Sequence, residues 1–453
     1  MTTTPSIGLD DETGTTMTRT INRRMLLTAA AGIGLTGALA ACSRSSESGG
    51  GDTDDTDGAT TVRFTFWGPA FYQEFTGEMV TAFEADNTDV AVEQEPAEWS
   101  GYWDRLATQV AAGDEPDVIN MDGKYLAEYA GRGGLADLEQ LGIDLSRVSQ
   151  GDLDSGRIDG TLYALSTGQN AWVLLANPAV FEAAGLEIPD DETWTWDDLA
   201  QTATTISEKV DDAVGLTGGG SYADLTIWAR QNGEDLWKPE GMAVSDDVLT
   251  AWYQWYLDLQ ESGATLDATA TQEESTLSME QQSFSLGKAG LSWAWTNQLA
   301  NFRTSTGSEE IVMLRPPSMS GAATENGLFG KASMFWSISA RTEVPDEAAR
   351  LVDFLVNDPQ ANTIQLLNRG VPSSPEVLDS ISGDLTPTDS YVAEFLTEVL
   401  QEISTTPAVQ PTGTSTAQDV FTRYLTDVRF GDTTPAEAAA ATIEEVDATV
   451  VTS

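Results

Sequence analysis

A small cluster of polar side chains between two apolar runs is the stretch of this chain best suited to meet a small molecule. The polar residues 166–170, Ser-Thr-Gly-Gln-Asn, follow the apolar run 160–165 and precede the apolar run 172–176. Side-chain amides present a donor and an acceptor in one plane, which suits a ligand rich in hydroxyl groups. The pattern suggests two buried strands joined where the backbone crosses between two bodies of the protein. An ordinary strand-loop-strand with polar loop residues remains the alternative from this stretch alone.

The residue types that are missing exclude several kinds of catalytic chemistry. The chain has no histidine and a single cysteine, Cys42. Catalysis by Ser-His-Asp or Cys-His groups is therefore excluded, as are imidazole metal sites. One cysteine can form neither an intrachain disulfide nor a cysteine-rich zinc site. We expect no metal and no cofactor.

The charge balance limits the partners of the protein. Its 453 residues include 22 basic and 72 acidic side chains, for a net charge of −50. Nucleic acid is excluded as a partner, because phosphate binding needs clustered cations. A polyanionic substrate is disfavoured unless a local basic pocket exists. The simplest interpretation is an acidic, solvated surface.

The first part of the chain alternates strands and helices, which predicts a parallel α/β lobe. Strands are expected at 62–67, 90–92 and 117–119, with helical patterns at 78–84, 102–112 and 125–130 between and after them. In such sheets, ligands bind beyond the carboxyl ends of the strands. The loops after the first and third strands, at Trp67 and 120–125, should therefore face the same crevice.

Later segments show clear helix signals. Residues 179–184 read as a short helix, with Pro178 in its first turn and Gly185 as its C-cap. In the predicted helix 248–261, four large apolar side chains recur at helical spacing and are expected in the core. They are Trp252, Trp255, Tyr256 and Leu259.

The N-terminal segment predicts export and lipid anchoring. Arg23 and Arg24 precede an apolar stretch that is too short for a comfortable membrane span. The stretch ends in Leu-Ala-Ala-Cys42, which resembles the lipobox of bacterial lipoproteins. Residues 1–41 are thus predicted to be a signal peptide, and 42–61 a lipidated cysteine with a flexible acidic linker. A buried structural cysteine is the alternative, and twin-arginine versus general secretory export stays open.

Several motifs together resemble a known family. The segment 99–138 resembles the signature region of extracellular solute-binding protein family 1, which serves carbohydrate ABC importers. The segment 163–199, with Tyr-Ala-Leu-Ser and then Asn-Pro-x-x-Phe, resembles the first crossing between the lobes of these proteins. The segments 330–339 and 369–374 resemble the second and third crossings, and 284–298 resembles a strand that returns to the cleft.

The resemblance implies an α/β, two-lobe, periplasmic-binding-protein-like fold with a ligand cleft and hinge crossings. Lobe 1 would comprise residues 62–168 and 331–371, and lobe 2 residues 172–328 and 375–453. It also implies ligand-binding residues by their place in the family's motifs. These are Trp67, Asp122, Lys124, Gln169, Asn170, Tyr222, Trp295, Asn297, Trp336 and Arg369.

The function implied is capture of a sugar, expected to be an oligosaccharide, and its delivery to the membrane permease of an ABC importer. The protein would be a binding protein and not an enzyme, held to the extracellular face of the cell membrane by its lipid. A secreted glycoside hydrolase, which would use two carboxylates, is one alternative. A peptide-binding surface lipoprotein is another. The identity and length of the sugar stay open.

Overall fold

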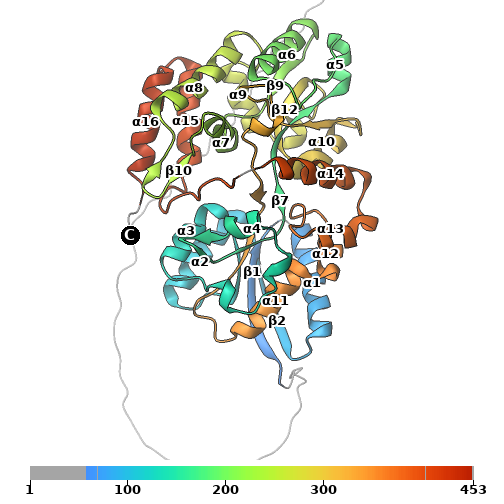
Figure 1. Ribbon diagram of the computed structural model, residues 1–453, viewed down its shortest axis with the longest axis vertical. Helices are drawn as coiled ribbons and strands as arrows, with labels where there is room; N and C mark the ends of the chain where they lie inside the picture. Colours follow the sequence, from blue (N-terminus) through green and yellow to red (C-terminus); the bar gives the residue numbers. More distant parts are fainter. Residues whose placement is uncertain (1–57, 69, 404, 451–453) are drawn as a thin grey trace, which may run out of the picture. The chain divides into compact units, whose positions relative to one another are not determined.

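The computed structural model describes residues 58–450 except residues 69 and 404, and Figure 1 shows the course of the chain. The predicted signal peptide 1–41, Cys42 and most of the predicted linker lie outside the described residues. Within the described part, no helix is both long enough and apolar enough to cross a membrane. The fold is organised around two main sheets, one in each lobe.

The sheet of the first lobe has five strands in the order β2-β1-β3-β15-β6. They are β1 (Thr60–Trp67), β2 (Val90–Ala97), β3 (Val118–Met121), β15 (Phe335–Ile338) and β6 (Leu165–Ser166). β1 runs parallel to β2 and β3, as the sequence predicts. β15 is antiparallel to β3 and β6, because the chain returns to this sheet at the edge where β1 and β3 end.

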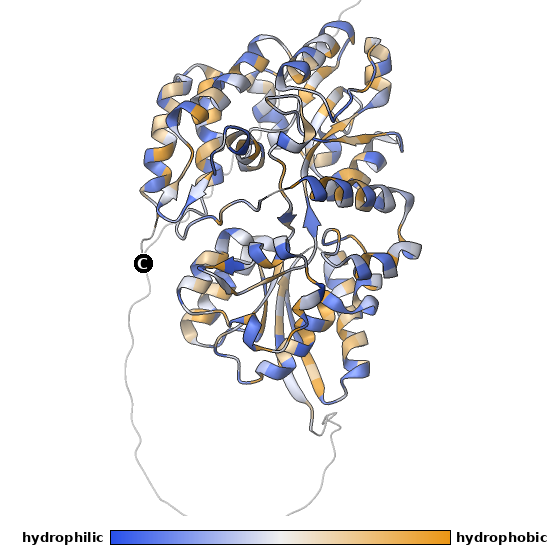
Figure 2. Ribbon diagram, in the orientation of Figure 1, coloured by the Kyte–Doolittle hydropathy of each residue, from blue (hydrophilic) through white to orange (hydrophobic). Residues whose placement is uncertain are grey.

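Helices cover both faces of this sheet. They are α1 (Ala70–Asp86), α2 (Trp99–Ala112), α3 (Gly123–Gly131), α4 (Gln150–Ser155), α11 (Pro345–Asn357) and α12 (Pro359–Gln365). Successive residues of a strand point to opposite faces. Phe64 and Val118 accordingly share one apolar cluster with residues of α1 and α11, whereas Ile119 shares another with residues of α2 and α3. Figure 2 shows the bands of apolar and polar residues that this packing produces along the helices.

Two elements of the first lobe differ from the expectation. The apolar run 160–165 forms two short strands, since β5 (Thr161–Leu162) pairs with β4 (Arg157–Ile158), whereas β6 pairs with β15. α1 begins at Ala70, well before the predicted helical pattern at 78–84. Burial of Phe75 and Thr76 outweighs the low helix propensity of the glycine that follows them.

The second lobe contains a four-stranded sheet in the order β13-β8-β12-β9. Its strands are β13 (Val312–Leu314), β8 (Trp172–Ala176), β12 (Ala289–Trp295) and β9 (Val214–Thr217). β12 is antiparallel to β8 and parallel to β9. All five residues of β8 are buried, which confirms the apolar run as a core strand.

Many helices and a small hairpin complete this lobe. The helices are α5 (Pro178–Ala184), α6 (Trp196–Lys209), α7 (Tyr222–Gln231), α8 (Asp246–Glu261), α9 (Ala268–Ser275), α10 (Leu299–Thr306), α14 (Pro387–Glu402), α15 (Ala417–Phe430) and α16 (Pro435–Asp447). A further helix, α13 (Pro375–Ile381), packs against α12 of the first lobe and, through Ile381, against the apolar cluster of the second. The hairpin pairs β10 (Trp237–Lys238) with β11 (Gly241–Met242). α5 begins at Pro178 and is capped by Gly185 at φ +69°, as predicted. Trp252, Tyr256 and Leu259 lie in the core, and Trp255 packs against it.

Three short segments join the lobes and lie side by side. β7 (Gln169–Asn170) pairs antiparallel with β14 (Lys331–Ala332). On its other side, the N–H of Gln169 donates to the carbonyl of Val371 at 2.7 Å, and the N–H of Val371 donates back at 2.9 Å. A Cβ on Gly168 would lie 2.6 Å from the carbonyl oxygen of Arg369, so only glycine permits this close approach. We call these three paired segments the hinge. Figure 1 shows β7 between the two sheets.

Candidate ligand-binding cleft

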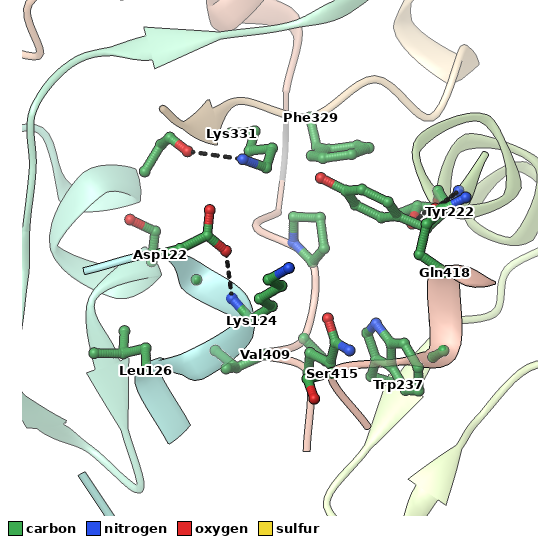
Figure 3. Close-up of a pocket in the computed structure, with 18 of the residues that line it drawn as sticks. Asp122, Lys124, Leu126, Tyr222, Trp237, Phe329, Lys331, Val409, Ser415 and Gln418 are labelled. Carbon is green, nitrogen blue, oxygen red and sulfur yellow. Dashed lines mark hydrogen bonds between the residues drawn. The ribbon is translucent and has the colours of Figure 1, made fainter. Parts of the chain in front are cut away.

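A cavity of about 460 Å³ lies beside the hinge and is lined by residues of both lobes (Figure 3). This volume is within the range of about 300–1,000 Å³ that is usual for ligand pockets. Its aromatic lining residues are Tyr222, Trp237, Phe329, Phe335 and Phe421, and its charged or amide lining residues are Asp122, Lys124, Lys331, Gln410, Gln418 and Asp419. We call it the cleft cavity.

Asp122 reaches the cleft cavity because it directly follows β3. It is the N-cap of α3, and its carboxylate accepts a hydrogen bond from the backbone N–H of Lys124 at 3.0 Å. A carboxyl group at this end of a parallel strand lies at the edge where α/β folds bind ligands. The helix N-terminus also stabilises its negative charge. Asp122 therefore lines the cleft cavity. Its contact with a ligand stays a prediction.

Lys331 places a cation next to the hinge. Its Nζ donates to the carbonyl of Ala332 at 3.2 Å and lies 5.4 Å from the ring centre of Trp295. Burial lowers the pKa of Lys331, but nearby Tyr222 and Asp122 raise it, and the net pKa is above its ordinary value. Burial also raises the pKa of Tyr222, against the opposing effect of Lys331. The pair is therefore an ammonium beside a neutral phenol at neutral pH.

Lys124 supplies a second cation from the first turn of α3. Its Nζ lies 4.8 Å from the ring centre of Trp99 and 5.0 Å from that of Tyr125. Trp99 is 41% exposed. Ring faces attract an ammonium through their negative electrostatic potential. Figure 3 shows the side chain of Lys124 directed into the cleft cavity.

The glycine-rich loop before α7 brings Tyr222 to the cleft cavity. Residues 218–220 all have positive φ, at +70°, +79° and +71°. A Cβ on Gly219 would lie 2.3 Å from the hydroxyl oxygen of Tyr256, and one on Gly220 would lie 2.5 Å from Leu425. The loop therefore needs glycine for both conformation and space. It has a structural role in positioning Tyr222.

A buried carboxylate fixes the end of this loop. Asp224 is fully buried and accepts hydrogen bonds from the hydroxyl of Tyr256 at 2.7 Å and from the indole N–H of Trp252 at 3.2 Å. Its other oxygen accepts the backbone N–H and the hydroxyl of Ser221, each at 2.8 Å. Burial raises the pKa of Asp224. This network holds the start of α7, and so Tyr222, in place.

A segment without regular structure forms another wall of the cleft cavity. Residues 406–410, between α14 and α15, line it together with Gln418 on α15. The amide oxygen of Gln418 accepts the backbone N–H of Tyr222 at 2.8 Å. Sequence reasoning missed this wall, because proline-rich irregular segments carry no periodic pattern. It also missed Trp237, although an aromatic residue just before the turn Lys-Pro-Glu-Gly was a usable signal.

Of the ten residues named from the sequence, Asp122, Lys124 and Tyr222 line the cleft cavity. Trp295 lies next to it, against the ammonium of Lys331. Trp67 is 7% exposed and belongs to an aromatic cluster of the first lobe, with Tyr102 at 5.1 Å between ring centres. The structure therefore places this ring in the interior rather than in the cleft cavity.

Trp336 and Arg369 are also placed in the interior of the first lobe. Both are 0% exposed. The guanidinium of Arg369 lies 4.9 Å from the ring centre of Trp336 and 4.7 Å from that of Phe75, and it donates to the hydroxyl of Thr76 at 2.9 Å. Burial lowers its pKa to about 10. Neither residue lines a described cavity, so we do not include them in a ligand site.

Gln169 lines a different cavity, of about 640 Å³, which we call the hinge cavity. Its amide donates to the buried carboxylate of Asp152 at 2.6 Å, and the hydroxyl of Ser149 donates to the same group at 2.8 Å. Burial raises the pKa of Asp152, while hydrogen bonds from Ser373 and Gln169 lower it. The remaining charged residues of this lining, Asp154 and Asp379, are exposed.

Asn170 and Asn297 line a third, smaller cavity of about 280 Å³. Asn170 is buried, donates to the hydroxyl of Ser333 and accepts the hydroxyl of Thr296 at 3.2 Å. Asn297 is exposed. The hinge thus separates the polar residues of the crossing into different cavities. In the part of the chain that the structure describes, no group of three or more acidic, histidine or cysteine side chains could hold a metal ion.

Comparisons with known proteins agree with this architecture. Residues 68–362 match the bacterial extracellular solute-binding protein family. The chain is 24% identical over 435 residues to the diacetylchitobiose binding protein DasA of Streptomyces coelicolor, covering 92% of this chain and 96% of the relative. These matches extend across both lobes.

Solved structures share the fold. An extracellular solute-binding protein family 1 from Alicyclobacillus acidocaldarius has a TM-score of 0.70 at 25% identity, covering 87% of this chain and 99% of that one. A periplasmic oligogalacturonide binding protein from Yersinia enterocolitica has a TM-score of 0.72 at 21% identity, covering 86% and 98%. Because the family match spans more than half of the sequence and the structures share its two-lobe fold, the chain belongs to the bacterial extracellular solute-binding proteins.

Proposed function

We propose that this protein captures a sugar, by class an oligosaccharide, in the cleft cavity and delivers it to an ABC importer. The observation that carries the proposal is the lining of the cleft cavity, where aromatic rings and hydrogen-bonding groups from both lobes meet beside the hinge. A sugar ring presents an apolar face and paired hydroxyl groups, which aromatic and planar polar side chains match. The names of two similar proteins, for diacetylchitobiose and oligogalacturonide binding, support the same ligand class.

The residues divide the work by their chemistry. Trp237 and Phe329 supply ring surfaces, whereas Asp122 and Gln418 supply acceptors and a donor for hydroxyl groups. Lys331, at the hinge, adds an ammonium donor. Ligand contacts from both lobes would favour a closed arrangement, and the three paired crossing segments would absorb the motion. A permease could then distinguish the loaded from the unloaded protein.

Anchoring belongs to the same proposal. Residues 1–41 would direct export, and Cys42 would carry the lipid. Residues 42–61 would tether the two lobes, with the boundaries predicted from the sequence, at the extracellular face of the membrane. Labelled palmitate should enter the wild-type protein in bacteria, and Cys42→Ser should abolish the label and release the protein into the soluble fraction. A labelled Cys42→Ser protein would reject this assignment.

We also propose that the cleft binds without catalysis. The carboxylates that line the cleft cavity are Asp122 and the exposed Asp419. A glycosidase needs two carboxyl groups that flank the scissile bond at a defined separation. Incubation with oligosaccharides should therefore leave them intact. Released products would favour the hydrolase alternative instead.

A thermal-shift screen of the purified protein tests the central proposal. Mono- and oligosaccharides form the main panel, with amino acids and peptides as controls. A ligand that binds only the folded state raises the melting temperature, by an amount that grows with concentration. We expect a shift with one class of saccharide. A shift with a peptide and with no saccharide would keep the fold and reject the sugar.

A further inference from the structure

The lysines of this chain are few and unevenly placed. The sequence contains only five, Lys124, Lys209, Lys238, Lys288 and Lys331, among 72 acidic residues. Two of the five line the cleft cavity. In a protein with a net charge of −50, this is a concentration of positive charge at the one place where a ligand is expected. Removing water from a lysine ammonium inside a cavity is unfavourable unless a partner replaces the water. The position of these two lysines therefore indicates a role in ligand binding.

One of the two cations has a local counter-charge. Asp122 acts on Lys331 and, together with Tyr222, raises the pKa of its ammonium group, so the lysine stays protonated although it is buried in the wall. The ammonium of Lys331 also has an acceptor in the protein, the carbonyl of Ala332 at 3.2 Å. The same ammonium can donate hydrogen bonds to a neutral ligand.

The other cation, Lys124, has no hydrogen-bond acceptor of this kind among the described residues. The ammonium of Lys124 forms no hydrogen bond and no ion pair with any residue that the structure describes, and its neighbours are the rings of Trp99 and Tyr125. The Asp122 carboxylate accepts the backbone N–H of Lys124. The remaining acidic lining residue, Asp419, is exposed on α15. The inner wall therefore carries two ammonium groups against one carboxylate.

We propose that the cleft cavity selects a saccharide that carries a carboxylate, as in a uronic acid, and that Lys124 determines this preference. This inference rests on the proposed capture of a sugar and specifies its class. A ligand that closes the cleft over Lys124 removes water from its ammonium, which is unfavourable unless an anion replaces that water. A carboxylate would do so through a charge-assisted hydrogen bond, one of the stronger non-covalent contacts.

The size of the uncompensated charge favours a carboxylate over a phosphate ester. The inner wall carries two ammonium groups, Lys124 and Lys331, and one carboxylate, Asp122, which leaves one positive charge. A carboxylate carries one negative charge, whereas a phosphate monoester carries close to two at neutral pH. The second charge would have no partner in a protein that already repels anions at longer range. The sugar part would still use the rings of the same cavity.

Calorimetric titration of the purified protein with matched ligand pairs tests the inference. The probes are di- and trisaccharides of galacturonic and glucuronic acid, each compared with its uncharged methyl ester, and the corresponding neutral oligosaccharides. We expect at least one acid to bind about tenfold or more tightly than its ester. Lys124→Met should abolish this ratio, and Lys124→Arg should preserve most of it. Lys238→Met, at an exposed position outside the cavity lining, should leave the ratio unchanged.

The outcomes separate this inference from the proposed function. Neutral sugars or esters that bind as well as the acids would overturn the carboxylate preference and keep the sugar-binding function. A preference that survives in Lys124→Met would reject the role of Lys124. Absence of binding by every saccharide, in a protein that melts cooperatively, would reject both proposals. Melting curves of each variant, recorded without ligand, show whether a loss of binding reflects a loss of folding.

Discussion

The cleft cavity and the hinge cavity both border the crossing segments, yet their linings differ in kind. They share Gly330 and Thr406. The hinge cavity is the larger, at about 640 Å³ against about 460 Å³. None of its described lining residues is aromatic or basic, and its charged residues are three aspartates. The cleft cavity has five aromatic residues and two lysines. Volume alone would have selected the less suitable of the two.

The difference teaches that polar groups should be judged by what they already bind. In the hinge cavity, the carboxylate of Asp152 is bonded to Gln169 and Ser149, so its hydrogen-bonding capacity serves the fold. In the cleft cavity, the ammonium of Lys124 lies over aromatic rings and that of Lys331 bonds one backbone carbonyl. Those groups retain donors for a ligand. We therefore interpret the hinge cavity as structural and the cleft cavity as the binding site.

The largest expected effect is a loss of folding stability on substitution of Asp152 in the hinge cavity. Asp152→Ala should lower the free energy of unfolding by about 2–3 kcal/mol, because it leaves the buried amide of Gln169 and the hydroxyl of Ser149 without their acceptor. Urea denaturation measures the change. Asp154→Ala, on the same helix but exposed, should change stability by less than about 0.5 kcal/mol. Equal effects of the two substitutions would contradict the structural role.

The next largest expected effect is a loss of ligand affinity, which should follow a substitution in the cleft cavity but not one in the hinge cavity. Lys331→Met should weaken binding of the sugar found in the screen by about 10- to 100-fold, since a charge-assisted hydrogen bond is lost. Titration calorimetry measures the dissociation constant. Gln401→Ala, which alters the lining of the hinge cavity, should leave the affinity within about twofold. A larger effect from Gln401→Ala than from Lys331→Met would reverse the assignment of the two cavities.

A smaller effect on affinity is expected at Tyr222. Tyr222→Phe keeps the ring and removes the hydroxyl group that faces Lys331 (Figure 3). Loss of one neutral hydrogen bond should weaken binding by about 3- to 10-fold. The melting temperature without ligand should barely change, because the backbone of Tyr222 is held by Gln418. Unchanged affinity would mean that this hydroxyl does not contact the sugar.

The smallest expected effect is a pH dependence of folding stability that arises from Asp152 in the hinge cavity. Burial raises the pKa of Asp152 above its ordinary value of 3.8, so the folded state holds this proton to higher pH than the unfolded state does. The stability that protonated Asp152 contributes is fully present below the pKa of its carboxyl group in the unfolded state. It is lost as the pH rises through the pKa of that group in the folded state. The stability of the wild type relative to Asp152→Asn should thus fall as pH rises from about 4 towards neutrality. A difference that rises with pH in urea titrations would contradict the raised pKa.

Much of the fold follows from local signals in the sequence. The apolar run of β8, the proline and glycine at the ends of α5, and the aromatic spacing in α8 all predicted what the structure shows. The parallel order of β1, β2 and β3 followed from strand and helix alternation. The same rule placed Asp122 and Lys124 at the cleft cavity, because residues after the carboxyl ends of such strands share one edge of the sheet.

The remaining parts of the site depend on packing that no local pattern reveals. Trp336 and Arg369 occur in crossing segments, but both side chains are buried in the first lobe. Trp336 belongs to the short strand β15, which is buried at every position. Gln169 and Asn170 are adjacent, so strand alternation sends them to different cavities. The wall at 406–410 reaches the cleft cavity only through tertiary structure. Lys331 belongs to β14, a strand of two residues, which is too short to show a periodic pattern in the sequence.

The most direct test of the account is a crystal structure of the protein with the saccharide identified by the screen. The account predicts density for the sugar in the cleft cavity, with its ring against Trp237 or Phe329 and its polar groups within hydrogen-bond distance of Asp122 and Lys331. Density in the hinge cavity, beside Asp152, or at any other surface would contradict the assignment of the binding site.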